Sequence, residues 1–211
     1  MQNKRQFSWR NTRDPFKILI AELLLRKTTA RQVESVYSEF LEKFPNPKSL
    51  ASATSSSIEN EIERLGIQHQ RAVLLKRLSQ IIVEEFHGGM PASEEDLKSL
   101  PGVGQYGANA VLNLAYGKKV PLVDVNVLRV INRVFGIKSS KKRARNDPEM
   151  WNFAKKLLPR KNTRDHNLAM LDFASAICVS RGPKCRQCFA TPYCVYYVDL
   201  LQARRNQTHA Q

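Results

Sequence analysis

Four cysteines near the C-terminal end are the residues whose spacing points most directly to chemistry. They follow the pattern C-x6-C-x2-C-x5-C and are Cys178, Cys185, Cys188 and Cys194. Clustered cysteines in an intracellular protein are more often metal ligands than disulfides, because the cytosol keeps thiols reduced. Paired zinc knuckles usually have two close C-x2-C pairs, whereas this segment has one. The pattern therefore favours a 4Fe-4S cluster, with zinc and unliganded thiols as the alternatives.

The same segment is strongly basic. Lys184 and Arg186 lie between the cysteines, and Asp199 is the only acidic residue from Cys178 to the end of the chain. Such a loop can present cations to phosphate groups. The alternative is that these cations balance the negative charge of a thiolate-bound cluster.

A glycine-containing hairpin is predicted in Leu100-Pro101-Gly102-Val103-Gly104. Gly102 and Gly104 on either side of Val103 allow a tight turn and a close approach to another backbone. The exposed N–H groups, together with the start of the following helix, can bind a phosphate oxygen. A plain connection between two helices can also use proline and glycine, so both interpretations stay open.

Two carboxylates are candidates for acid-base or electrostatic catalysis. Asp124 stands where a helix should begin, so it is either an N-cap or a pocket carboxylate that stabilises positive charge and activates water. Glu22 lies in the apolar run Ile18–Leu25, where burial would raise its pKa and let it hydrogen-bond or protonate a leaving group. The alternative for Glu22 is a narrow polar stripe shared with Lys17 and Arg26.

Helices are the elements that must position these residues, because apolar residues recur at intervals of three and four and no long stretch alternates. The sequence predicts an all-α fold with short glycine-marked connections. It also predicts an exposed basic connection at Lys138–Asp147 and a frayed tail at Ala203–Gln211. The expected helices are Pro15–Ala30, Gln32–Phe44, Ile58–Leu65, Arg71–Phe86, Glu94–Leu100, Tyr106–Tyr116, Asn126–Phe135, Pro148–Leu158 and His166–Cys178.

Composition narrows the class of partner. The chain has 211 residues, 42% of them hydrophobic, with a formal net charge of +15. The apolar content is typical of a packed globular protein and excludes fibrous or disordered classes. The charge favours nucleic acid, a preference shared with ribosomal proteins. Neither a membrane-spanning run nor a secretory signal is recognisable, so we expect a cytoplasmic, nucleoid-associated protein.

The order of these motifs resembles the helix-hairpin-helix DNA glycosylases of base excision repair, in the branch that carries an iron-sulfur cluster. The resemblance runs from Phe7-Ser8-Trp9-Arg10 to Cys194. It implies two helical lobes with a DNA-binding cleft between them, residues 16–118 forming one lobe and residues 1–15 plus 119–197 the other. Residues 198–211 would be a tail. A monomer acting on mismatched double-stranded DNA, without a membrane partner, is implied as well.

The resemblance also assigns the reaction. The aspartate that begins the helix after the hairpin segment is the catalytic carboxylate of that family, which implies Asp124. Endonuclease III and its relatives have a lysine two residues after the last hairpin glycine, and its amine forms a Schiff base with the sugar. Here that residue is Tyr106, whose phenol cannot form an imine. A monofunctional glycosylase that leaves an abasic site is therefore implied, unless Tyr106 only packs on the next helix.

Further roles follow by the same resemblance. Lys27 would fill the space vacated by a flipped nucleotide, Ile67 would be the apolar wedge and Asn126 would contact the backbone beside the flipped sugar. Arg71, in the same segment as Ile67, is taken as another DNA contact. The alternatives are that Lys27 is an ordinary surface lysine, that Ile67 is a core residue and that the Asn126 amide only caps its helix.

The substrate is indicated by Phe7-Ser8-Trp9-Arg10, by Leu23–Thr29 and by Val123-Asp124-Val125-Asn126. These segments look most like archaeal and bacterial mismatch glycosylases that remove thymine or uracil opposite guanine. The adenine-mismatch glycosylases are the alternative, although they usually have a further C-terminal domain and this chain ends 17 residues after Cys194. A non-catalytic protein that binds mismatched DNA, and a lyase that uses another lysine, also remain open.

Overall fold

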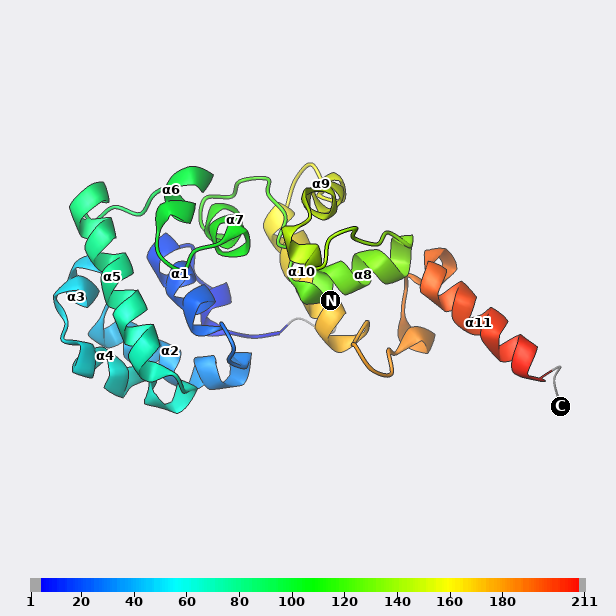
Figure 1. Cartoon of the computed structure of the whole chain (residues 1–211), viewed down its shortest axis with the longest axis horizontal. Coiled ribbons are helices and arrows are strands. Elements are labelled where there is room, and N and C mark those ends of the chain that lie inside the picture. The colour runs from blue at the N-terminus through cyan, green and yellow to red at the C-terminus, as the bar shows by residue number, and fades with distance from the viewer. Residues whose placement is uncertain (1–4, 209–211) are drawn as a thin grey trace. The chain divides into compact units, whose positions relative to one another are not determined.

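A computed structural model describes residues 5–208, and within this range the regular structure is helical throughout (Figure 1). The all-α prediction is therefore confirmed. The chain divides into two compact units, one formed by Gln6–Lys118 and the other by the described parts of Met1–Arg5 and Lys119–Gln211. Each unit has its own hydrophobic core.

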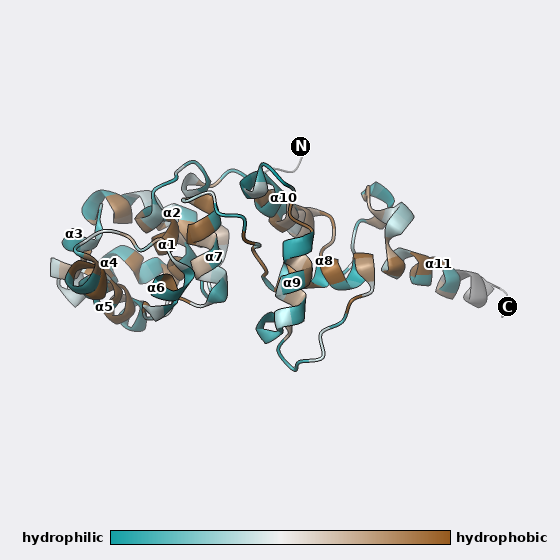
Figure 2. Ribbon diagram, turned by 90° about the horizontal axis from the view of Figure 1, so that it is seen from above, coloured by the Kyte–Doolittle hydropathy of each residue, from teal (hydrophilic) through white to brown (hydrophobic). Residues whose placement is uncertain are grey.

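The unit Gln6–Lys118 contains seven α-helices and two short 3-10 helices. In it α5 packs against α3 and α4, while α7 packs against α1 and α6. Figure 2 shows brown, apolar stretches on α1, α5 and α7. The elements are η1 (Ser8–Arg10), α1 (Pro15–Leu24), α2 (Ala30–Lys43), α3 (Pro47–Ser52), α4 (Ser55–Ile62), η2 (Glu63–Leu65), α5 (Gln68–Phe86), α6 (Glu94–Ser99) and α7 (Gln105–Leu114).

Side-chain caps explain where several of these helices begin. Asp14 accepts hydrogen bonds from the backbone N–H groups of Phe16 and Lys17, and Pro15 occupies the first helical position. Ser93 caps α6 in the same way through Asp96 N–H. Such caps satisfy N–H groups that have no partner within the helix.

The predicted helix Pro15–Ala30 is wrong in its second half. α1 ends at Leu24, and α2 begins at Ala30 after a loop in which Lys27 has a left-handed backbone with φ 57°. The reason is a capping box: Thr29 accepts from Gln32 N–H while the Gln32 side chain accepts from Thr29 N–H. This start signal outweighs the apolar content of the preceding run.

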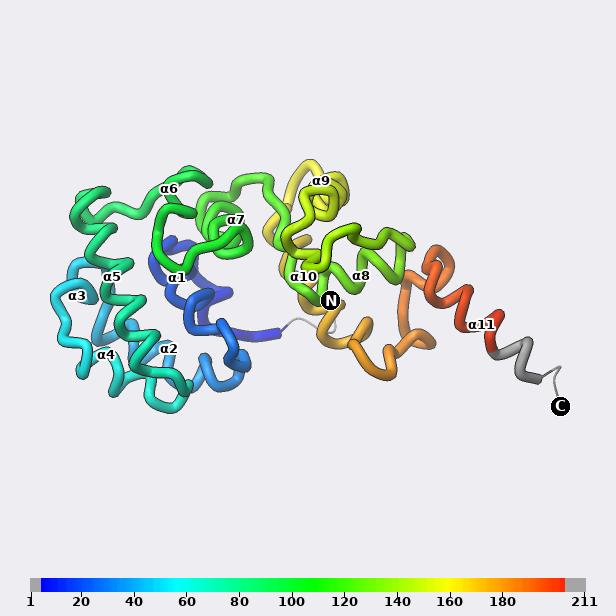
Figure 3. Tube along the Cα trace, viewed as in Figure 1, coloured from blue at the N-terminus to red at the C-terminus, as the bar shows by residue number. Residues whose placement is uncertain are grey.

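The second unit is arranged around α8, which packs against α10 and α11. Val127, Leu128 and Ile131 on α8 form one apolar cluster with Met150 and Ala154, and Val130 and Val134 face a second cluster that includes Cys178 and Cys194. The elements, traced in Figure 3, are α8 (Val125–Phe135), η3 (Ala144–Asn146), α9 (Pro148–Lys156), α10 (Thr163–Ala176), η4 (Cys185–Gln187), η5 (Thr191–Tyr193) and α11 (Val195–Thr208).

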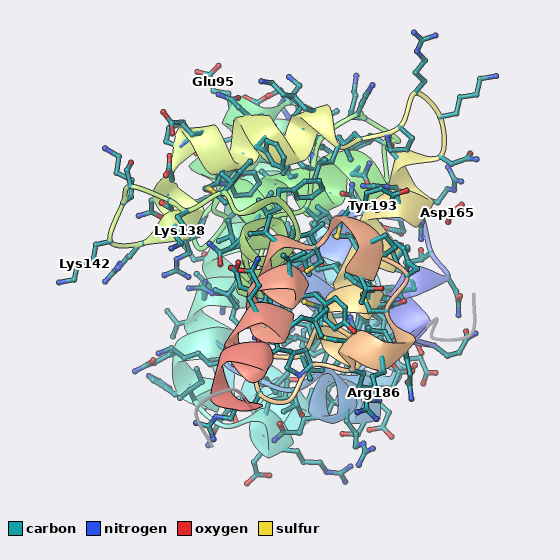
Figure 4. The ribbon with its side chains drawn as sticks, turned by 90° about the vertical axis from the view of Figure 1, so that its right-hand side faces the viewer. Glu95, Lys138, Lys142, Asp165, Arg186 and Tyr193 are labelled. Carbon is teal, nitrogen blue, oxygen red and sulfur yellow. The ribbon has the colours of Figure 1, made fainter. Side chains whose placement is uncertain are left out.

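Two terminal and loop predictions have different outcomes. The sequence predicts a frayed tail from Ala203, but the chain is helical as far as Thr208, where α11 ends. Residues 209–211 lie outside the described part. The basic connection before α9 is exposed as expected at Lys138 and Lys142, which extend away from the ribbon in Figure 4. None of the described helices combines the length and apolar character that a bilayer crossing requires.

Candidate functional site

Asp124 is the N-cap of α8 and is held by three N–H donors. Its Oδ1 accepts from the backbone N–H groups of Asn126 at 2.9 Å and Val127 at 2.7 Å, and its Oδ2 accepts from Asn126 Nδ2 at 2.7 Å. All three partners are donors, so both oxygens of the carboxylate act as acceptors and its orientation is fixed. The half-buried side chain is thus both a helix cap and a fixed negative charge, and the two interpretations of Asp124 are compatible.

Asn126 is itself oriented by an arginine that sequence reasoning missed. Arg129 Nη1 donates to Asn126 Oδ1 at 2.9 Å, which directs the amide nitrogen of Asn126 toward Asp124. The same guanidinium donates to the carbonyls of Ala174 and Cys178, both at 2.8 Å. A continuous chain of hydrogen bonds therefore connects the backbone of the first cysteine to Asp124. The available signal was an arginine in the amphipathic α8, three residues after Asn126.

The four cysteines line one pocket of the second unit. Cys178 and Cys194 are buried, Cys185 and Cys188 are partly exposed, and apolar neighbours such as Phe173 and Ile177 complete the lining. Their sulfur atoms are not gathered into a closed metal-ligand group among residues 5–208.

Burial and the mutual proximity of the cysteines disfavour free thiolates at this pocket, so ionised sulfurs here require compensating positive charge. Burial raises the pKa of the Cys185 and Cys188 thiols, and neighbouring cysteines raise both further. Four ionised sulfurs here would need positive charge nearby, from metal and from cationic side chains. Arg133 lies beside them, with Nη1 3.6 Å from Cys178 Sγ and bonded to the carbonyl of Val179 at 2.6 Å.

The outer face of the cysteine loop is cationic and aromatic. Lys184 and Arg186 are exposed, and Arg186 lies at the edge of the loop in Figure 4. Phe189 and Tyr193 are 80% and 81% exposed. Large aromatic rings are usually more buried than this, and exposed apolar groups often mark a surface that binds another molecule. This surface can meet phosphate groups through its cations.

The hairpin between α6 and α7 has the backbone that its glycines predict. Gly102 has φ 79°, and a Cβ atom there would lie 2.9 Å from Arg26 Nη1 and 3.0 Å from the Leu74 side chain. Val103 is buried and anchors the turn, whereas Gly104 is exposed, with open space around it. Gly104 is the N-cap of α7 and makes no side-chain hydrogen bond to its first turn.

Tyr106 and Glu22 belong to the same unit as the hairpin. Tyr106 lies in the first turn of α7 and Glu22 in the last turns of α1, and these two helices pack together. Both side chains are half-buried. Ile20, Leu23 and Leu24, which are close to Glu22 in the sequence, are all buried.

Lys27 and Ile67 both occupy exposed loop positions with left-handed backbones. Their φ angles are 57° and 48°, and the Ile67 side chain is 48% exposed. The alternative of a core isoleucine does not hold. The exposed side chain of Ile67 contributes little to the hydrophobic core, and its left-handed backbone is strained, so neither feature stabilises the fold.

Arg71 differs from the other predicted DNA contacts because its charged end points into the protein. The residue is 5% exposed, and its guanidinium donates to the carbonyls of Leu24 and Arg26 at 2.6 Å each and to Thr28 Oγ1. A direct contact with a phosphate would require these bonds to break.

Comparisons with known proteins agree on one family. Residues 20–156 match the family model of the HhH-GPD superfamily base excision DNA repair proteins. The thymine/uracil-DNA glycosylase of Pyrobaculum aerophilum is 48% identical over 92% of this chain and 86% of its own length. The thymine-DNA glycosylase of Aeropyrum pernix is also 48% identical, over 92% of this chain and 87% of its own length.

A solved structure gives the same result. The structure of a thermostable thymine-DNA glycosylase superposes with a TM-score of 0.88 at 40% identity, covering 92% of this chain and 89% of that one. Adenine DNA glycosylases are more distant: that of Buchnera aphidicola from Acyrthosiphon pisum is 28% identical over 56% of its own length.

Proposed function

The chain belongs to the HhH-GPD superfamily of base excision DNA repair proteins, and from this membership we propose that it removes thymine or uracil mispaired with guanine from double-stranded DNA. The observation that carries the proposal is the carboxylate of Asp124, fixed by three N–H donors at the start of α8. Similarity to thymine/uracil-DNA glycosylases at 48% identity supports the choice of base.

The reaction is hydrolysis of the N-glycosidic bond. A stacked base cannot be reached inside a duplex, so the nucleotide is first flipped out, at least cost where it is mispaired. The bond between C1′ and the base nitrogen breaks, and its electron pair leaves with the base. Asp124 stabilises the positive charge that develops on the sugar and orients the water whose oxygen joins C1′, and the proton that this water loses neutralises the departing base. Glu22 and Tyr106 hold the base and favour its departure.

The reaction stops at an abasic site because Tyr106 has no amine. A covalent imine with the sugar requires a lysine or another amine as the nucleophile. In this proposal the backbone of Gly102, Val103 and Gly104, together with Lys184 and Arg186, binds phosphates, while Asn126 contacts the backbone beside the flipped sugar. Lys27 and Ile67 enter the space that the flipped nucleotide leaves. The protein acts on DNA inside the cell as a monomer.

The cofactor we propose is a 4Fe-4S cluster held by Cys178, Cys185, Cys188 and Cys194. The pocket that these residues line, with Arg133 beside it, supports this set of ligands. Hydrolysis needs no electrons, so the cluster's contribution is to hold the loop in place. Iron and acid-labile sulfide in anaerobically purified protein should each approach four per chain, and Cys188→Ser should lower both.

The activity is tested with end-labelled duplexes that contain a single G:T, G:U, G:A or 8-oxoguanine:A pair. Half of each reaction is treated with alkali. Alkali-dependent cleavage at T and U is the expected result. Cleavage only at A would replace the proposal with adenine removal, and cleavage without alkali or a borohydride-trapped adduct would indicate a lyase.

Two variants of Asp124 separate catalysis from capping. Asp124→Asn keeps an oxygen that can cap α8, so its unfolding free energy should stay near that of the wild type. Asp124→Ala loses the cap and about 1 kcal/mol of stability. Both should bind a G:T duplex and fail to release thymine. Wild-type protein that binds the mismatch but releases no base would instead be a mismatch-binding protein.

A further inference from the structure

The loops that carry Lys27 and Ile67 share an unusual backbone. The described residues contain four non-glycine positions with positive φ: Lys27 in the loop after α1, and Ile67, His87 and Asn162 at helix boundaries. Left-handed backbone is rare for a β-branched residue such as isoleucine and persists only where surrounding structure holds it. Contacts from elsewhere in the unit must therefore hold these two loops.

One residue, Arg71, contacts both loops, the Ile67 loop through its backbone and the Lys27 loop through its buried side chain. The backbone N–H of Arg71 donates to the carbonyl of Ile67 at 3.1 Å, closing the first turn of α5. The guanidinium reaches the end of α1, where two of its acceptors, Arg26 O and Thr28 Oγ1, belong to the residues immediately before and after Lys27. Arg71 thus connects the loop of Ile67 to the loop of Lys27.

The arrangement is costly to maintain. Burial lowers the pKa of Arg71, and the nearby positive charge of Arg26 lowers it further. The buried Nε atom has no hydrogen-bond partner within the described part of the chain. A neutral side chain could fill this space without such costs, which points to a requirement for the guanidinium fork and its three bonds.

The hairpin is linked to the same group. Arg26 Nη1 donates to the carbonyl of Gly102 at 3.3 Å, while the carbonyl of Arg26 accepts from Arg71. The phosphate-binding backbone and the two loops are therefore joined by consecutive hydrogen bonds within one unit.

We propose that Arg71 is a positioning residue that fixes the Lys27 and Ile67 loops relative to each other, so that both side chains enter the DNA stack together. The inference rests on the proposed function and assigns Arg71 a role different from the phosphate contact that the sequence suggests. Because its guanidinium is bound to protein oxygens, Arg71 acts on DNA only through the loops it holds.

The test is a double-mutant cycle on the full chain. Arg71→Lys keeps the charge but cannot make all three guanidinium bonds, and it is introduced into the wild type and into the Lys27→Ala/Ile67→Ala protein. The measurement is the single-turnover rate of thymine release from a G:T duplex. We expect Arg71→Lys to slow the wild type about tenfold and the loop variant less than about twofold, since coupled residues are non-additive. Arg77→Lys, an exposed arginine on the same helix, is the matched control and should leave the rate unchanged.

A second readout does not depend on base release. In the inactive Asp124→Asn protein, fluorescence of 2-aminopurine beside the mismatched thymine should rise on binding as the stack opens. Adding Arg71→Lys should remove most of this rise while binding at saturation is kept. If Arg71→Lys does not fold, Thr28→Val removes one acceptor with little change of volume and should reduce the rise in part.

The outcomes distinguish this inference from the proposed function. Equal slowing by Arg71→Lys in both backgrounds, or an unchanged fluorescence rise, would overturn the positioning role while leaving the glycosylase activity intact. A wild-type protein that neither releases thymine nor opens the stack would overturn the proposed function and this inference with it.

Discussion

At the scale of single residues, the catalytic candidate is defined by what holds it. Asp124 receives two backbone N–H groups and one side-chain amide, and that amide is oriented by Arg129. Of these three hydrogen bonds, only the one from the Asn126 side-chain amide comes from a group that a substitution can remove while the helix backbone is kept. Asn126 is therefore the place where the orientation of Asp124 can be tested separately from its charge.

We predict that Asn126→Ala slows base release by about ten- to a hundredfold, because Asp124 Oδ2 loses its donor and Arg129 Nη1 loses its acceptor. Single-turnover kinetics on a G:T duplex measure the rate, and the affinity for product-like abasic DNA measures binding. Asn132→Ala is the matched control on the same helix, since within the described part of the chain the Asn132 side-chain amide donates to the carbonyl of Ile137 and not to the Asp124 group. Comparable slowing by both variants would attribute the effect to helix stability.

At the scale of elements, the hairpin shows that its two glycines have different reasons to be glycine. Gly102 combines a positive φ with a Cβ position already crowded by Arg26 and Leu74. Gly104 has an ordinary φ of −97° and nothing within 4 Å of a Cβ atom. The fold therefore requires glycine at position 102, whereas at position 104 it would accept a side chain, and we assign that glycine to the proposed contact with a phosphate.

Alanine at each position should separate these requirements. Gly102→Ala is expected to lower the free energy of unfolding by about 1–2 kcal/mol through left-handed strain, with a further penalty from crowding against Leu74. Gly104→Ala should unfold like the wild type but bind duplex DNA more weakly, because its methyl group hinders a phosphate. Denaturant unfolding and equilibrium binding are the measurements. Equal destabilisation by both would contradict this division.

At the scale of the whole molecule, the net charge of +15 is the property that governs encounter with DNA. Each cation that neutralises a phosphate releases counterions, so affinity depends on salt. Lys184 and Arg186 are exposed on the cysteine loop and are the cations we assign to this contact.

Replacing these two cations should change the salt dependence by a predictable amount. The double variant Lys184→Gln/Arg186→Gln should reduce the slope of log affinity against log salt concentration by about 0.9 for each phosphate that is no longer neutralised. Lys48→Gln, an exposed lysine on α3, is the control and should leave the slope unaltered. An unchanged slope in the double variant would mean that the loop cations balance cluster charge.

The sequence alone determined the features that depend on local chemistry. The all-α class follows from apolar periodicity, helix starts follow from Asp14 and Asp124 as caps, and the hairpin follows from its glycines. The short α3 was not predicted, because its six residues carry too little periodicity. The order of motifs along the chain was enough to indicate the family.

Only the tertiary structure decided the features that depend on residues far apart in the chain. The direction of Arg71 is set by carbonyls more than forty residues away, and the orientation of Asn126 by an arginine bound to the carbonyl of Cys178. A sequence pattern records which side chains can donate or accept. Which partner lies within hydrogen-bond distance is a property of packing, and so the roles of Arg71 and Arg129 became visible only in the folded chain.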